Sequence, residues 1–266
     1  MRHARSLTKA LVGLAALTAF SPAMAIKYGD LDGENHPHVG LMIAKDASGN
    51  PMWRCSGTLM TPTIFLTAGH CTYGATTVEI WFATDVDSGR PGNGYPFEGE
   101  VDGTPYTHPL YPTASFVRND VGLVILNTPV MKSTYGSLPQ RGELNRLATR
   151  RGLKSVDFTS VGYGLQFINP VFVESARVRM YATPQLIQIN VPGFTGDFSM
   201  LLSNNHSTGG TCFGDSGGPN FLGDSNVVAA VTSFGINGNC AGTGGVFRLD
   251  TDNALDWLAG FGLSPP

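Results

Sequence analysis

The sequence predicts an all-β protein. Glycine and proline are frequent, with 34 and 17 residues, whereas only 14% of the chain is charged. Short runs of β-branched and aromatic residues alternate with turn residues, and helical periodicity is nearly absent. A chain of this length can form one large β unit or two small barrels that share a core region.

Ten strands are expected from apolar runs bounded by turn residues. In the first half they are residues 39–44, 56–60, 64–68, 77–82 and 121–126, and in the second half 156–161, 176–181, 186–191, 227–233 and 245–249. The polar stretch 132–152 is interpreted as the connection between the halves. One short helix is expected at 251–260, where Asp252 is a candidate N-cap and Gly260 ends the apolar pattern.

Residues 1–25 have the three parts of a secretory signal peptide. A basic start is followed by an apolar run over residues 10–20, and small residues precede the junction at Ala25. A membrane span is the competing interpretation, but it needs roughly 20 apolar residues, and Ser21 and Pro22 end this run sooner. We therefore expect a mature chain that begins at Ile26 and is secreted, into the periplasm or the extracellular medium.

Charge and hydropathy limit the partners of the mature chain. Removing the leader takes away three basic and no acidic residues, so the formal charge changes from -3 to -6. This balance gives no electrostatic reason to expect nucleic acid as a partner. No later stretch is long and apolar enough to cross a bilayer, so we expect no membrane association after cleavage, and we expect a monomer.

The chain has four cysteines, Cys55, Cys71, Cys212 and Cys240, which allow three pairings in principle. Export favours disulfides over free thiols, and proximity in the sequence suggests Cys55 with Cys71 and Cys212 with Cys240. Zinc bound by Cys55, His70 and Cys71 is the rival interpretation. Adjacent His70 and Cys71 lack the spaced ligand pairs of structural zinc sites, so disulfides are preferred.

A candidate nucleophile is Ser216, in the run G-D-S-G-G at residues 214–218. A serine hydroxyl needs a neighbouring base and donors that hold the oxyanion formed by its attack. The flanking glycines allow a tight turn, so the N–H groups of Gly214 and Ser216 are the natural oxyanion donors. The run also fits the G-x-S-x-G elbow of α/β-hydrolases, but that fold places its histidine after the serine, and the last histidine here is His206.

The base must therefore precede the serine, and His70 is the candidate because it follows an apolar strand and adjoins a cysteine. Asp120, just before the strand expected at 121–126, could orient the imidazole and stabilise the imidazolium. Each residue also has an ordinary interpretation. A lone histidine is more often structural or solvated, and an Asn-Asp pair before a strand is otherwise a turn.

Together, the three segments resemble the chymotrypsin-like serine proteases. T-A-G-H-C at 67–71 resembles that family's T-A-A-H-C, N-D-V-G-L at 119–123 is similar to its D-I-A-L segment, and 214–219 read G-D-S-G-G-P. The order His, Asp, Ser is also the family's. The resemblance implies a fold of two six-stranded antiparallel β-barrels, about 26–140 and 141–266, with a short C-terminal helix. It also implies a serine endopeptidase activity through His70, Asp120 and Ser216.

Further residues match the family's pattern near the substrate. Val161 to Gly164 resembles the family's G-W-G element, and 233–235 read S-F-G where the family has S-W-G. The resemblance implies that Ser233 supports Asp120, that Gly235 pairs with the substrate backbone as an added strand, and that Phe234 keeps an aromatic wall. The sequence departs from the family's pattern without losing a catalytic group. The departures are Gly69 before the histidine, Phe234 in place of Trp, and two disulfides where vertebrate members have more.

The resemblance also bears on activation. In the family, a freed N-terminal Ile ammonium inserts beside the Asp that precedes the catalytic Ser, and Ile26 and Asp215 match these positions. Signal peptidase alone would then expose Ile26, without a separate pro-segment. The alternative is that Ile26 is merely the first ordered residue.

Specificity follows from the residue six before the nucleophile, which lies at the base of the primary pocket in the family and is Gly210 here. An aspartate at this position would select Lys or Arg before the cut, so its absence argues against cleavage after basic residues. With Gly235 and Gly245 on the walls, we expect large apolar or aromatic side chains before the cut. The sequence leaves open whether Asp224 or Asp250 brings a negative charge into this pocket from another loop.

No metal or organic cofactor is assigned. His36 and His38 flank Pro37 in a segment interpreted as a solvated loop, without further ligands of clear spacing. The partner expected from the resemblance is a protein or peptide substrate. Two other functions stay open: a catalytically silent binding protein on the same fold, and an esterase that uses the same site.

Overall fold

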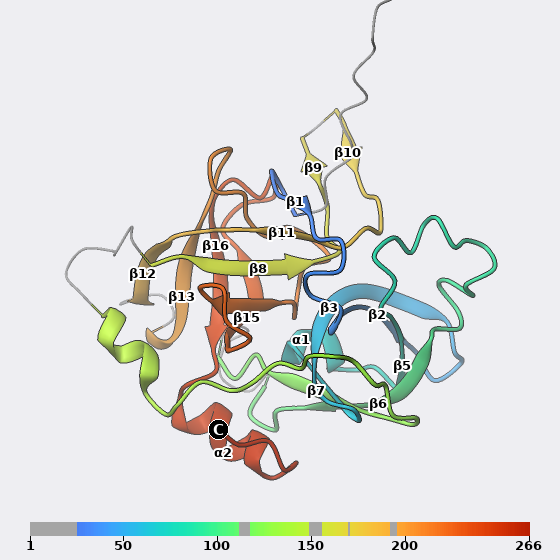
Figure 1. The fold of residues 1–266 in the computed structure, drawn as a ribbon, viewed down its shortest axis with the longest axis horizontal. Coiled ribbons are helices and arrows are strands. Elements are labelled where there is room, and N and C mark those ends of the chain that lie inside the picture. The colour runs from blue at the N-terminus through green and yellow to red at the C-terminus, as the bar shows by residue number, and fades with distance from the viewer. Residues whose placement is uncertain (1–25, 112–117, 149–155, 170, 192–195) are drawn as a thin grey trace, which may run out of the picture.

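The protein is described by a computed structural model that covers residues 26–111, 118–148, 156–169, 171–191 and 196–266 (Figure 1). The expected signal peptide, residues 1–25, lies outside the described residues. Strands dominate, as the sequence predicts, and form two units that lie side by side.

The first half of the chain forms a closed antiparallel barrel, with the strand order β2-β3-β4-β7-β6-β5. A buried apolar cluster that includes Met42, Phe65 and Val124 from these strands stabilises it. Val161 and Phe247 from the second half belong to the same cluster, so the two halves share a core. The strands of this barrel are β2 (Val39–Lys45), β3 (Pro51–Thr61), β4 (Ile64–Thr67), β5 (Thr77–Trp81), β6 (Val101–Thr107) and β7 (Gly122–Leu126).

The second half forms an eight-stranded antiparallel sheet, ordered β1-β11-β8-β14-β15-β16-β13-β12. It differs from the expected closed six-stranded barrel, because β1 joins one edge and no strand pair closes the sheet within the described residues. Its strands are β1 (Asp30–Leu31), β8 (Phe158–Gly162), β11 (Met180–Ala182), β12 (Leu186–Val191), β13 (Gly196–Asn204), β14 (Pro219–Leu222), β15 (Val228–Gly235) and β16 (Gly242–Arg248). A small hairpin, β9 (Phe167–Ile168) and β10 (Val173–Glu174), projects beyond this sheet (Figure 1).

All ten expected strands are present, with shifted ends, while β1, β6, β9, β10, β13 and β14 were not expected. The short helices are α1 (Gly69–Thr72), the 3-10 turn η1 (Glu143–Leu147) within the connection, and α2 (Asp252–Ala259) at the expected C-terminal position. The N-cap of α2 is Thr251 and not Asp252, because the Thr251 hydroxyl accepts the Ala254 N–H.

The interpretation of 36–38 as a solvated loop was wrong for His38. Its side chain is fully buried, and its ring lies against Phe221 of β14 at a centroid distance of 5.5 Å. Neither ring nitrogen has a hydrogen-bond partner among the described residues. Burial is the main reason that the pKa of His38 falls to about 4, and the positive charges of His36 and Arg179 lower it further.

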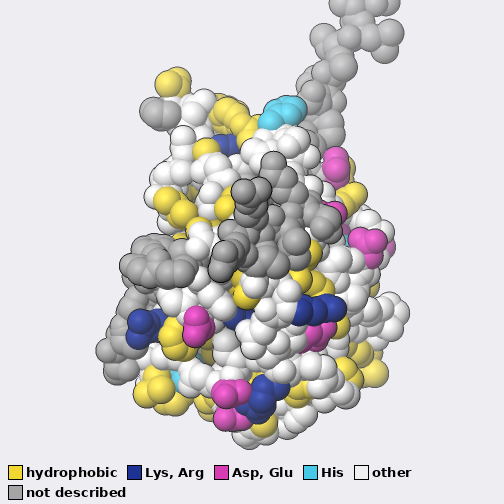
Figure 2. Space-filling view, turned by 90° about the vertical axis from the view of Figure 1, so that its left-hand side faces the viewer, with side chains coloured by type: hydrophobic (Ala, Val, Ile, Leu, Met, Phe, Trp, Pro, Cys, Tyr) yellow, Lys and Arg dark blue, Asp and Glu magenta, His cyan; other side chains and the backbone are white. Residues whose placement is uncertain are grey.

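The surface carries mixed charge. On the face shown in Figure 2, Lys and Arg side chains and Asp and Glu side chains are both scattered, and neither sign forms one large patch. Among the described residues, no helix has the length and apolar character to span a bilayer.

Candidate active site

The register of two barrel strands brings His70 and Asp120 together. β4 and β7 are antiparallel, and Thr67 at the end of β4 lies opposite Gly122 at the start of β7. His70 follows Thr67 by three residues and Asp120 precedes Gly122 by two. Both side chains therefore emerge at the same end of this strand pair.

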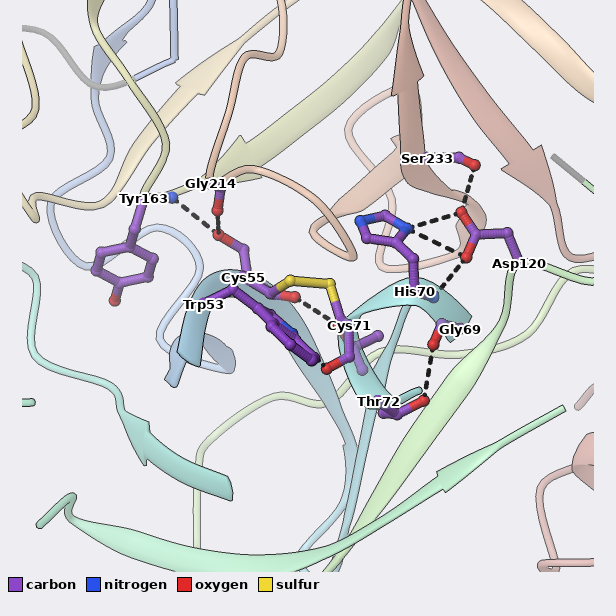
Figure 3. The surroundings of a disulfide bond; sticks show 12 residues. Trp53, Cys55, Gly69, His70, Cys71, Thr72, Asp120, Tyr163, Gly214 and Ser233 are labelled. Atoms are coloured by element: carbon purple, nitrogen blue, oxygen red, sulfur yellow. Dashed lines mark hydrogen bonds and ion pairs between the residues drawn. A yellow bond between two sulfur atoms is a disulfide. The ribbon is translucent and has the colours of Figure 1, made fainter. Parts of the chain in front are cut away.

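Asp120 is buried and accepts hydrogen bonds from two directions. Its carboxylate accepts the His70 backbone N–H at 2.8 Å and lies 2.9 Å from His70 Nδ1. On the other side it accepts the hydroxyl of Ser233, from β15, at 2.5 Å (Figure 3). These contacts fix the ring of His70 with Nδ1 toward the carboxylate, which leaves Nε2 for a proton from elsewhere.

The electrostatics of this pair favour an imidazolium. Burial lowers the pKa of His70, but the negative charge of Asp120 and its hydrogen bond to the ring raise it more, so the net pKa lies above the ordinary value of imidazole. A ring with these surroundings can accept a proton and hold the resulting charge beside Asp120.

The loop that carries Ser216 docks on the first barrel. The Ser56 N–H of β3 donates to the carbonyl of Ser216 at 2.8 Å. Gly217 has a φ of +77°, and a Cβ there would lie 2.0 Å from Thr67 Oγ1, so only glycine fits. Because Thr67 ends β4, this contact holds the serine loop beside His70.

His70 and Ser216 line one cavity of about 410 Å³. No hydrogen bond joins the Ser216 hydroxyl to the His70 ring within the described residues. Such bonds are often looser in the unliganded state than with substrate bound. The arrangement therefore brings the two groups to the same cavity.

Ser216, which lines this cavity, and Gly214, two residues before it, both have a backbone N–H group without an acceptor in the described part of the chain. The other N–H groups from 215 to 218 are bonded to carbonyls. The Ser56 hydroxyl donates to the Gly214 carbonyl at 2.9 Å and accepts the Tyr163 N–H at 3.0 Å (Figure 3). Free donors held in this way are suited to an oxyanion. Sequence reasoning assigned no role to Ser56.

The cavity walls differ in part from those expected. Phe234 and Gly235 line the cavity, but Gly210 and Gly245 do not. A Cβ on Gly210 would meet Asn204 at 2.4 Å, and one on Gly245 would meet the Phe234 ring at 2.2 Å, so these side chains cover the two glycines. The structure instead gives the following polar lining residues, which were not expected: Asn204, Thr211, Thr232 and Thr243.

Neither carboxylate that the sequence left open reaches this cavity. Asp250 forms a buried ion pair with Arg248 at 2.8 Å and accepts the Leu144 N–H. Asp224 lines a separate cavity beside Arg146.

The structure has two disulfides, Cys55–Cys71 and Cys212–Cys240. The first ties α1, which carries His70, to β3, and the second forms part of the cavity wall. Because the Cys55 and Cys71 sulfurs are bonded to each other, they are not zinc ligands, although both lie within 4.8 Å of a His70 nitrogen.

The proposed activation pair is not formed in this chain, where the Ile26 nitrogen is a peptide nitrogen. Ile26 is buried against Met180 and Ala182. The Asp215 carboxylate is fully buried and accepts N–H groups of Gly164 and Cys212 at 2.7 and 2.8 Å. Burial raises the pKa of Asp215 to about 7 in spite of these bonds, so this acid lacks a strong counter-charge.

Comparisons with known proteins relate the chain to proteases. The family model described as Trypsin matches residues 32–258. Serine protease 1 of Drosophila melanogaster is 28% identical over 228 residues, which cover 83% of this chain and 78% of that protein. Brachyurin of Leptuca pugilator is 27% identical over 235 residues, 84% and 91% of the two chains. A solved structure of HL collagenase aligns with a TM-score of 0.70 and 22% identity, over 90% of this chain and all of that one.

Proposed function

The chain belongs to the trypsin family of serine proteases and is a serine-type endopeptidase, and from this premise we propose that it cuts peptide bonds with Ser216, His70 and Asp120. The observation that carries the proposal is the hydrogen-bonded pair of His70 and Asp120 on the same cavity as Ser216. The unbonded N–H groups of Gly214 and Ser216 support it further.

The proposed reaction is acyl transfer in two stages. His70 Nε2 takes the proton of Ser216 as its oxygen attacks the carbonyl carbon, and the N–H groups of Gly214 and Ser216 hold the oxyanion. The imidazolium then gives its proton to the leaving amine, and an acyl-enzyme remains. Water, deprotonated by the same ring, attacks the ester, and the ring returns this proton to the Ser216 oxygen as the acid product leaves. Asp120 keeps Nδ1 protonated throughout, and the Ser233 hydroxyl holds the carboxylate in place.

For primary specificity we propose large apolar or aromatic side chains before the cut. Apolar walls come from Phe213, Phe234 and the Cys212–Cys240 disulfide. None of the described residues that line the cavity is an Asp or Glu. The edge of β15 at Ser233 to Gly235 extends beyond its pairing with β14, which ends at Val231, and could accept a substrate strand. Peptides that differ only at the residue before the cut test this, and a strong preference for Arg would overturn it.

We propose that the protein is secreted as a monomer after loss of residues 1–25, and that the freed Ile26 ammonium pairs with Asp215. Support comes from the buried position of Ile26 and from the bridge between Lys27 and Gly210, which already docks this segment beside the serine loop. The fully buried Asp215, with a pKa raised to about 7 by burial, would gain its counter-charge.

Casein digestion by the protein that begins at Ile26 tests the proposed function. The wild type should digest casein, and Ser216→Ala and His70→Ala should lose this activity while they keep the wild-type circular dichroism. Hydrolysis of a simple ester without casein digestion would favour the esterase, and absence of both activities would favour a binding protein. Undiminished casein digestion by Ser216→Ala would refute the proposal.

A further inference from the structure

A second hollow adjoins the Ser216 cavity at Phe213. Its volume is about 330 Å³, and Phe213, which also lines the Ser216 cavity, forms part of its wall. Gly214, one of the proposed oxyanion donors, is also in its wall. A group bound in this hollow would therefore lie beside the bond that is cut. Its remaining lining residues are Arg54, Tyr95, Leu165, Ser175 and Arg177.

Arg54 brings a cation next to the oxyanion donor. A Cβ on Gly214 would lie 3.0 Å from Arg54 Nε and 3.1 Å from Nη2. Nη2 donates to the Ser175 hydroxyl at 3.1 Å, and no ion pair joins Arg54 to a carboxylate within the described residues. Burial lowers the pKa of Arg54, although the attraction of Tyr95 and Asp215 raises it in part. This guanidinium is thus half-buried, has hydroxyl partners, and keeps donors free.

Arg177 supplies a second cation on the same hollow. Its Nε donates to the Tyr95 hydroxyl at 3.2 Å, and its Nη1 lies 3.5 Å from Asp87 Oδ1. Asp87 also faces Arg90 at 3.3 Å, so one carboxylate serves two guanidinium groups. Positive charge therefore exceeds negative charge at this site.

The Asp215 carboxylate does not neutralise Arg54 by direct contact. Its two oxygens are occupied by the N–H groups of Gly164 and Cys212. It attracts Arg54 only at a distance, so the close partners of the guanidinium are the hydroxyls of Ser175 and Tyr95 and not a carboxylate.

The direction in which the substrate chain crosses the active site determines which of its residues lie at this hollow. In the proposed function, the residues before the cut add to β15 near Ser233, and the side chain before the cut enters the Ser216 cavity. Figure 3 shows Ser233 and Gly214 on opposite sides of the His70 ring. An extended chain that passes Ser216 from the Ser233 side continues over Gly214, so its next residues meet Arg54.

We propose that this hollow is a subsite for an Asp or Glu side chain in one of the first two residues after the cut, with Arg54 as its main partner and Arg177 as the second. The inference rests on the proposed function. A carboxylate fits the planar guanidinium with two parallel hydrogen bonds, and these are strong when one partner is partly desolvated. The subsite would direct the protease to bonds followed by acidic residues.

Internally quenched peptides of one sequence test the subsite, with Glu, Gln or Lys at the first or second position after the cut. For the wild type, kcat/KM should be about tenfold higher for Glu than for Gln at one of these positions, and Lys should be poorest. Arg54→Gln should bring the Glu to Gln ratio close to one, and Arg54→Lys should keep part of it. Arg177→Gln should reduce the ratio less, and high salt should reduce it in the wild type.

Arg146→Gln is the matched control, because Arg146 is exposed and lines a different cavity. It should leave the ratio unchanged. A peptide anilide, which has no amino acid after the cut, measures the catalytic site alone, and Arg54→Gln should hydrolyse it as fast as the wild type does.

Equal wild-type rates for Glu and Gln, with normal anilide hydrolysis, would overturn the subsite and leave the proposed function standing. Equal loss on every substrate in Arg54→Gln would also overturn it, since Arg54 would then act on the serine loop. A wild type inactive on all substrates would overturn both proposals.

Discussion

One residue added in front of Ile26 should both destabilise and inactivate the mature protein. The comparison is between a protein that begins at Ile26 and one that begins with an extra glycine, which moves the ammonium away from its proposed place beside Asp215. The pKa of Asp215 without that ammonium is about 7, against 3.8 for an ordinary aspartate. At about 1.4 kcal/mol per pH unit, the ionised carboxylate costs about 4 kcal/mol of folding free energy at pH 8.

The sign of the pH dependence follows from the raised pKa. The folded extended protein holds the Asp215 proton more tightly than the unfolded chain does, so its stability falls as pH rises from about 4 to about 7. The ammonium of Ile26 should lower the pKa of Asp215 and remove most of this loss. Arg54 already attracts the Asp215 carboxylate from a distance, but the pKa of Asp215 stays raised.

Urea unfolding at pH 5 and pH 8 measures this difference, with Ser216→Ala in both proteins to prevent self-digestion. The extended protein should lose a few kcal/mol between the two pH values relative to the protein that begins at Ile26. Asp215→Asn in the extended protein is the control and should abolish the loss. If the two N-terminal forms are equally stable at pH 8 and, with Ser216 restored, equally active, the reasoning on Asp215 is refuted.

Three further changes test single contacts. Asp120→Asn should reduce kcat by about 10⁴-fold, because the ring of His70 would lose its orientation and charge partner; steady-state kinetics on a peptide anilide measures this, and a loss under tenfold would contradict it. Ser233→Ala removes the 2.5 Å bond to Asp120 and should lower kcat about tenfold with KM little changed; an altered KM alone would instead indicate a role in substrate binding. The pKa of His38 is about 4 in the folded protein, against 6.5 ordinarily. Its contribution to the free energy of unfolding is therefore complete above pH 6.5 and is lost as pH falls through 4. This loss amounts to about 3 kcal/mol, and it should be absent from urea unfolding of His38→Leu; an unchanged acid slope in that variant would refute it.

The family and the all-β fold could be predicted because local sequence carries them. Short segments around His70, Asp120 and Ser216 occur in the family's order, and the family model confirms the resemblance. Strands such as β4 are continuous apolar runs that need no partner to be recognised. The roles of the site residues stay predictions, which the experiments above test.

The missed strands lack such a local signal. β6 reads V-D-G-T-P-Y-T, with a glycine and a proline inside it, and β14 begins with Pro219 directly after two glycines. Both are held by their neighbours in the sheet, β6 between β5 and β7 and β14 between β8 and β15. Pairing across the sheet overrides propensity at these positions.

The pocket walls depend on register, which the sequence does not reveal. A shift between Thr232 and Phe234 pairs Phe234 with Gly245 and sets the Phe234 ring over that glycine. His38 is buried by Phe221, more than 180 residues later in the chain, so its surroundings could not be inferred locally. Arg54 was missed for the same reason, because its partner Ser175 lies 121 residues away.

The most direct test of the central claim is the site of covalent modification by a fluorophosphonate, located by peptide mass spectrometry. The account predicts one adduct, on Ser216, that forms in the wild type and is strongly slowed in His70→Ala. An adduct on a different residue, or unmodified Ser216 in a protein that digests casein, would contradict it.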